Sequence, residues 1–131
     1  MILVRVVAPV SDGPRRGQSL AALARVVHDL NVTFLRAHPD FPPLYRSGVR
    51  YAVEPVDARE QFCTAPAVLE QGWGDCDDLA PWRSAELVVR VGIEARPEVL
   101  RVGPRAWHVV VRLPDGRRLD PSKALGMKGP A

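Results

Sequence analysis

The chain has 131 residues, of which 47% are hydrophobic and 25% are charged, as in an ordinary globular protein with its own core. Its net charge is only +3 and its basic residues are scattered, which argues against a nucleic-acid partner. Two cysteines, Cys63 and Cys76, are too few for a disulfide framework, and we expect Cys63 to be a small buried hydrophobe. The apolar run at residues 1–8 is too short for a membrane span and lacks a signal-peptide cleavage pattern. We therefore expect a single domain over residues 1–131, made in a reducing cytoplasm and without a membrane span.

The first quarter of the chain predicts a strand and a long helix. Residues 2–8 are mostly β-branched and predict a short strand, whereas glycine, proline and arginine mark residues 11–17 as a loop. Residues 18–37 carry apolar side chains at helical spacing, with Ser19 as the expected N-cap. Pro39 follows and ends this helix.

Two further helices are predicted in the middle of the chain. Residues 49–53 fit a short strand, and residues 64–71 fit one or two helical turns that end at Gly72. A longer helix is expected to begin at Asp75 and to run to Arg90, with Gly92 as its stop signal.

The last third of the chain predicts an antiparallel sheet. Residues 93–102 fit a strand in which Pro97 indicates an edge or a bulge. Residues 106–113 form a stronger strand, and residues 117–120 return beside it after a turn. Helix-rich segments followed by antiparallel strands indicate an α+β fold, in which the helix that carries Cys76 packs on a small antiparallel sheet.

The segment 72–80 has the features that activate a cysteine nucleophile. Cys76 follows two glycines and opens a helix, where the helix dipole favours a thiolate. The backbone N–H of Cys76 has no partner within the helix and can point at an oxyanion. Asp75 is a fair N-cap, and Asp77 and Asp78 suit the first turn, but their charges oppose thiolate formation. A cationic histidine partner is therefore required.

His108 is the best candidate for this partner. It interrupts a run of β-branched residues in the strand at 106–113, where a histidine is unexpected unless it has a specific role. Alternation along the strand places His108, Val110 and Arg112 on one face of the sheet.

The turn after this strand decides whether Asp120 can join His108. Residues 113–116 fit a three-residue hairpin loop with a left-handed glycine, in which the first turn residue pairs with Arg117. Asp120 would then lie opposite Val110, as a diagonal neighbour of His108 on the same face. A two-residue turn would place Asp120 on the other face, so the triad predicts the turn type.

These three segments resemble the transglutaminase-like superfamily, which shares its core with papain-like cysteine peptidases. The resemblance rests on GDCDDLA at residues 74–80, WHVVV at 107–111 and LDPS at 119–122, and it covers residues 54–127. In that superfamily the cysteine opens the core helix, and the histidine and aspartate follow on adjacent strands in this order. The closing residues 120–127 look like the small members encoded in tailed phages and prophages.

The resemblance implies a catalytic triad of Cys76, His108 and Asp120. Cys76 would attack an amide or thioester carbonyl, and His108 would hold a thiolate–imidazolium pair and protonate the leaving amine. Asp120 would fix the tautomer and orientation of the imidazole. The Cys76 backbone N–H would be one oxyanion donor, and the second is open among Trp73, Gln71 and Gln61.

Two functions are compatible with these residues. The first is a cysteine protease, amidase or transamidase, a hydrolase or acyl-transfer enzyme acting on a peptide or a peptidoglycan-like substrate. The second is a virion component of a phage-like particle, which uses the same fold to dock phage structural proteins in the tail or head–tail region. No cofactor is expected, nor a metal, because Asp75, Cys76, Asp78 and His108 lack a second Cys/His pair at ligand spacing.

Three further expectations concern single residues. Pro81 departs from the family pattern and should bend the core helix near its start. His28 lies off the apolar stripe of its helix and His38 lies at the helix end, so both are expected to be solvated or to cap the helix. Arg83 and Glu86, one helical turn apart, are expected to form a surface ion pair.

Overall fold

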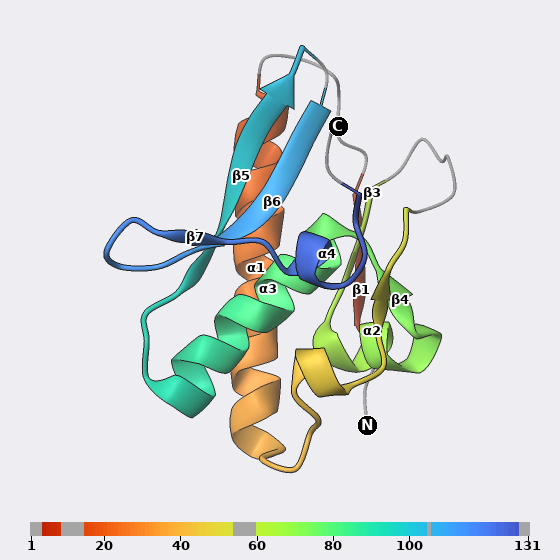
Figure 1. Cartoon of the computed structure of the whole chain (residues 1–131), viewed down its shortest axis with the longest axis vertical. Helices are drawn as coiled ribbons and strands as arrows, with labels where there is room; N and C mark the ends of the chain where they lie inside the picture. Colours follow the sequence, from red (N-terminus) through yellow and green to blue (C-terminus); the bar gives the residue numbers. More distant parts are fainter. Residues whose placement is uncertain (1–3, 9–14, 54–59, 105, 129–131) are drawn as a thin grey trace.

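The structure is a computed structural model that describes residues 4–8, 15–53, 60–104 and 106–128. Its elements form an α+β fold, as the sequence predicts, in which the three longer helices precede the antiparallel sheet at residues 96–119 (Figure 1). Among the described helices, none combines the length and the apolarity that crossing a membrane requires.

Two long helices and one sheet position the candidate site. Helix α1 (Arg16–Ala37) packs against helix α3 (Cys76–Glu86), and both contact the three-stranded antiparallel sheet (Figure 1). The strands of this sheet are β5 (Arg96–Gly103), β6 (Ala106–Arg112) and β7 (Arg118–Leu119), in that order. The prediction that the Cys76 helix packs on a small antiparallel sheet is therefore confirmed.

Two smaller strand pairs were not predicted as pairs. Strand β1 (Arg5–Ala8) pairs with β3 (Glu60–Cys63) in antiparallel orientation. Strand β2 (Arg50–Tyr51) pairs with β4 (Trp73–Gly74) in parallel orientation, so that β4 leads directly into α3. The sequence showed no periodicity for β3 or β4 because both are too short to display one.

Shorter helices complete the fold. Helix α2 (Ala65–Gln71) ends at Gly72 in the left-handed conformation, as predicted. A 3₁₀ turn, η1 (Leu44–Arg46), follows α1, and helix α4 (Pro121–Ala124) follows the last strand.

The sequence predicted a bend of the core helix at Pro81. Helix α3 continues past this residue without a break. The ring of Pro81 removes one backbone donor, the one that would have bonded to Asp77. After Glu86 the chain widens into a π turn, η2 (Leu87–Val91), and Gly92 ends it in the left-handed conformation. The predicted end at Gly92 is therefore confirmed, and the irregular turn lies beyond α3, far from Cys76.

The predicted N-cap of α1 is wrong. The helix begins at Arg16, with Arg15 as its N-cap, and Ser19 lies within its first turns. This earlier start brings Gly17 against the ring of Trp107 on β6. A Cβ atom built on Gly17 would lie 2.6 Å from two atoms of that ring, so only glycine allows this approach.

Replacing Gly17 by alanine is expected to lower the free energy of unfolding by about 1–3 kcal/mol, because the new methyl group collides with Trp107. Helix propensity alone predicts the opposite sign, a gain of up to about 1 kcal/mol. Urea unfolding of the two proteins measures the difference. Adding Trp107→Phe, which removes the crowded atoms, should recover part of the loss. A Gly17→Ala protein more stable than the wild type would contradict the close contact.

Two single-residue predictions are also wrong. His28 is buried rather than solvated, because α3 covers that side of α1 and brings Ser84 Oγ within 2.6 Å of His28 Nδ1. Arg83 and Glu86 do pair, at 2.9 Å, but Glu86 is buried and also accepts a hydrogen bond from the Leu44 backbone. His38, by contrast, is exposed and its Nδ1 lies 2.9 Å from the Phe34 carbonyl at the helix end, as expected.

Candidate active site

The start of α3 presents Cys76 on a tightly held turn. Asp75 is the N-cap, as predicted, and Cys76 is the first helical residue. Asp78 is fully buried, and its carboxylate accepts hydrogen bonds from the backbone N–H groups of Cys63 (2.7 Å) and Asp75 (3.2 Å). Asp78 therefore anchors the first turn of α3 to strand β3 and sets the direction in which the helix begins.

The hairpin between β6 and β7 has the predicted turn. The Leu113 N–H donates to the Arg117 carbonyl (2.8 Å), and the Gly116 N–H donates to the Leu113 carbonyl (2.9 Å). Gly116 has a φ of 91°, the left-handed conformation that this loop requires. In the strands, Val111 pairs with Leu119, so the register is the one that places Asp120 on the face of His108. The predicted turn type is confirmed.

This register brings His108 and Asp120 into contact. His108 Nε2 lies 2.7 Å from Asp120 Oδ2, and His108 is almost buried. The other oxygen of Asp120 accepts a hydrogen bond from the Lys123 backbone (3.3 Å) at the start of α4, which holds the carboxylate in place. Because a carboxylate accepts, we infer that Nε2 carries the proton and that Nδ1 presents a lone pair.

The sulfur of Cys76 contacts strand β6 at Val109, the residue that follows His108. The backbone N–H of Val109 lies against the sulfur of Cys76 and acts to lower its pKa. This N–H is on the edge of β6 that faces β7, as is that of Leu113, but β7 ends at Leu119 and leaves the position open. The thiol therefore occupies the edge position that a longer β7 would have filled, one residue along the backbone from His108.

The imidazole of His108 does not line the pocket beside the Cys76 thiol. Among the described residues, no hydrogen bond joins Cys76 Sγ to either ring nitrogen of His108. Cys76 instead lines a pocket of about 290 Å³, together with Leu20 of α1, Trp107 and Val109 of β6, and the acidic residues of the helix start.

The surroundings of Cys76 keep its thiol protonated. Burial raises the pKa of Cys76 from 9.0 to about 12, and the charges of Asp75, Asp78 and Asp120 add to the rise. Burial also raises the pKa of Asp77 well above its usual range, helped by a hydrogen bond with Asp75. The sequence predicted this conflict for Asp77 and Asp78, of which Asp78 is among the charges that raise the pKa of Cys76, but it did not predict burial, the largest cause.

The three acidic residues of this turn are close enough to raise the question of a metal. Oxygen atoms of Asp75, Asp77 and Asp78 lie within 4.8 Å of one another. The hydrogen bonds that Asp78 accepts from the backbone and the bond between Asp77 and Asp75 give these carboxylates structural partners. The cluster is therefore understood as a helix start in which burial and a neighbouring carboxyl group favour the protonated form of Asp77.

The predicted candidates for the second oxyanion donor do not line the Cys76 pocket. The side-chain amide of Gln71 donates to the Trp73 carbonyl (2.6 Å), which gives it a structural task. Gln61 lies on β3, beside β1. The role of Gln71, Gln61 or Trp73 as the second oxyanion donor therefore stays a prediction.

Tyr51 is a residue of the site that sequence reasoning missed. Burial raises the pKa of Tyr51, and the charges of Cys76, Asp75, Asp77 and Asp120 raise it further, so its phenol stays protonated, although it does not line the Cys76 pocket. The parallel pairing of Tyr51 with Gly74 brings it here. A strand of two residues carries no sequence signal for such a pairing.

Comparisons of this chain with models of known protein families, with curated proteins and with solved structures find no match.

Proposed function

We propose that this protein is a cysteine-dependent acyl-transfer enzyme with a transglutaminase-like, papain-like core, in which Cys76, His108 and Asp120 form the triad. The observation that carries the proposal is the 2.7 Å contact between His108 and Asp120, one residue from the backbone N–H that lies against the Cys76 sulfur. The chain order and the elements of Cys76, His108 and Asp120 are those that the proposed chemistry needs, and the helix that carries Cys76 packs on β6.

The protonated thiol makes His108 a general base rather than half of a preformed ion pair. Its Nδ1 takes the proton of Cys76 as the sulfur bonds to the carbonyl carbon of the substrate, and Asp120 stabilises the imidazolium that results. Collapse of the tetrahedral adduct breaks the carbon–nitrogen bond, and His108 returns the proton to the leaving amine. Water or a second amine then attacks the thioester, with Nδ1 again accepting a proton, and Cys76 is released.

The negative oxygen of the adduct needs donors. The backbone N–H of Cys76, at the first position of α3, has no acceptor among the described backbone groups. The phenol of Tyr51, kept protonated by its surroundings, is our candidate for the second donor. The substrate is a peptide or a peptidoglycan-like chain, whose acyl side chain would contact Leu20 and Trp107 in the pocket beside the sulfur.

A second candidate function is favoured by the pKa of Cys76. A thiol whose pKa is about 12 has almost no thiolate at neutral pH, which is typical of a structural cysteine. In this alternative the protein is an assembly component of a tailed-phage-like particle, and the same fold docks phage structural proteins without catalysis.

Alkylation by iodoacetamide near neutral pH separates the two functions. For the enzyme we expect Cys76, although protonated at rest, to be modified at least about ten times faster than in His108→Ala, because His108 takes the thiol proton as the sulfur attacks. Mass spectrometry of peptides measures the rate at each cysteine. Cys63, which is buried, is the internal control and should react only after unfolding.

The assembly component predicts a different profile. Cys76 would react slowly, its rate would rise with every unit of pH into the strongly alkaline range, and His108→Ala would not change it. That result, together with no cleavage of peptide or peptidoglycan fragments, would overturn the enzymatic proposal and favour docking.

A further inference from the structure

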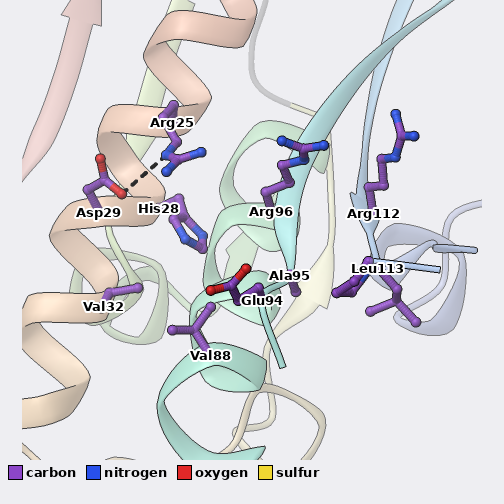
Figure 2. Close-up of a pocket in the computed structure, with 11 residues that line it drawn as sticks. Arg25, His28, Asp29, Val32, Val88, Glu94, Ala95, Arg96, Arg112 and Leu113 are labelled. Carbon is purple, nitrogen blue, oxygen red and sulfur yellow. Dashed lines mark hydrogen bonds and ion pairs between the residues drawn. The ribbon is translucent and has the colours of Figure 1, made fainter. Parts of the chain in front are cut away.

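A second pocket lies between helix α1 and the strands β5 and β6, apart from the Cys76 pocket. Its volume is about 510 Å³, larger than that of the Cys76 pocket, and no residue lines both. Figure 2 shows Arg25 and His28 of α1 on one side and Glu94 and Arg96, at the start of β5, on the other. This pocket takes no part in the chemistry proposed above.

The pocket holds an arginine whose charge is not compensated. Arg96 and Arg112 are directly opposite each other on β5 and β6, a like-charge arrangement that is unfavourable without counter-charges. Glu98 pairs with Arg112 at 2.9 Å and also with Arg118. The side chain of Arg96 has no ion pair or hydrogen bond within the described residues, so its guanidinium is available to an anion at the pocket.

Groups that require a hydrogen-bond donor line the same pocket. Glu94 is exposed, and it too has no ion pair within the described part of the chain. His28 is buried at the α1–α3 interface, where its Nδ1 lies 2.6 Å from Ser84 Oγ. The hydroxyl of Ser84 donates to the Pro81 carbonyl (3.2 Å), so we infer that it accepts from Nδ1–H and that Nε2 is a hydrogen-bond acceptor.

The other charged or titratable groups that line the pocket do not compensate the charges of Arg96 and Glu94. Arg25 pairs with Asp29 on the same helix, at 3.3 Å. Burial lowers the pKa of His28, which keeps the ring neutral and Nε2 an acceptor at neutral pH. One side of the pocket therefore offers an uncompensated cation, and another offers an uncompensated carboxylate near a neutral acceptor.

We propose that this pocket binds a small zwitterion of amino-acid to dipeptide size, with its carboxylate on Arg96 and its protonated amine on Glu94 and His28. A simple anion would leave Glu94 unpaired and would lie near its charge, and a simple amine would leave Arg96 unpaired. The inference stands independently of the function proposed for Cys76, because it uses other residues and another pocket.

The test is a titration of the full-length protein with alanyl-alanine and with two derivatives that each lack one charge. N-acetyl-alanyl-alanine lacks the ammonium group, and alanyl-alanine amide lacks the carboxylate. We expect alanyl-alanine to bind, and each derivative to bind about tenfold more weakly. Two-dimensional NMR spectra report the dissociation constants and should show shifts at the backbone amides of Val88, Ala95 and Leu113, which line the pocket.

Two variants assign the charges. Arg96→Gln should weaken alanyl-alanine about tenfold and remove the advantage of a free carboxylate, and Glu94→Gln should do the same for the free amine. Both side chains are exposed, so folding should be unaffected. The matched controls are Arg36→Gln and Glu70→Gln, which make the same charge changes at exposed positions outside the pocket and should leave binding unchanged.

Three results would overturn the proposal. The first is no binding of alanyl-alanine, and the second is equal binding of the N-acetyl derivative, which would make the pocket a simple anion site. The third is binding that persists in both pocket variants but disappears when Cys76 is alkylated, which would place the ligand in the other pocket.

Discussion

Replacing Trp82 by alanine is expected to lower the free energy of unfolding by about 3–5 kcal/mol, the range for removing a large aromatic side chain from a packed core. Trp82 is fully buried on α3 and contacts Phe41, with ring centroids 5.5 Å apart. It belongs to the core cluster that joins α2, α3 and the end of α1. The alanine variant would leave a cavity there that the surrounding helices can fill only in part. Urea unfolding at neutral pH measures the loss.

Trp82→Phe is the matched control. The indole Nε1 of Trp82 is buried without a hydrogen-bond partner among the described residues. Phenylalanine fills most of the same space and removes this unsatisfied donor, so we expect its cost to be about 1 kcal/mol or less. Equal losses in the two variants would show that the indole has a partner, and a small loss in Trp82→Ala would contradict its place in the core.

Raising the pH is expected to destabilise the wild-type protein through Cys76. The thiol has a pKa of 9.0 in the unfolded chain and about 12 in the folded one. Below about pH 9 the thiol is neutral in both states and its contribution to stability is fully present. Above that pH the unfolded chain loses the proton first, so the contribution falls as the pH rises towards 12. We expect a fall of about 2 kcal/mol between about pH 8 and pH 10.5.

The measurement is the difference in free energy of unfolding between the wild type and Cys76→Ala, because all other titrating groups are shared and cancel. The cavity in the variant shifts this difference by a constant, so only its change with pH is interpreted. Between about pH 6 and pH 8 the difference should stay constant, which is the internal control. A constant difference up to about pH 10.5 would mean that the fold does not raise the pKa of the thiol.

Local patterns in the sequence were enough for α1, α2 and α3, apart from the start of α1, and for one decisive turn. Gly72 and Gly92 end their helices because a left-handed residue is needed there and glycine supplies it. The hairpin loop at residues 113–116 sets the register of β6 and β7, and with it the meeting of His108 and Asp120. These features depend on interactions between residues close in sequence, which is why the sequence predicts them.

Features that depend on contacts between distant segments were missed. The start of α1 is set by the space that Trp107 leaves for Gly17, and the burial of His28 is set by the approach of α3. Tyr51 enters the site through a parallel pair of two-residue strands. In each case the partner lies at least twenty residues away, so no local periodicity signals it.

The sequence by itself determined an α+β fold, a cysteine at the start of a helix, and a histidine and an aspartate on one face of a hairpin. Only the tertiary structure decided how the helix lies on the sheet, and so placed the Cys76 sulfur against the Val109 backbone N–H. It also decided that the thiol is buried among carboxylates and keeps its proton. The reason is physical: hydrogen bonds within a turn act between neighbours in the chain, whereas burial and electrostatic fields arise from segments that meet only when the chain folds.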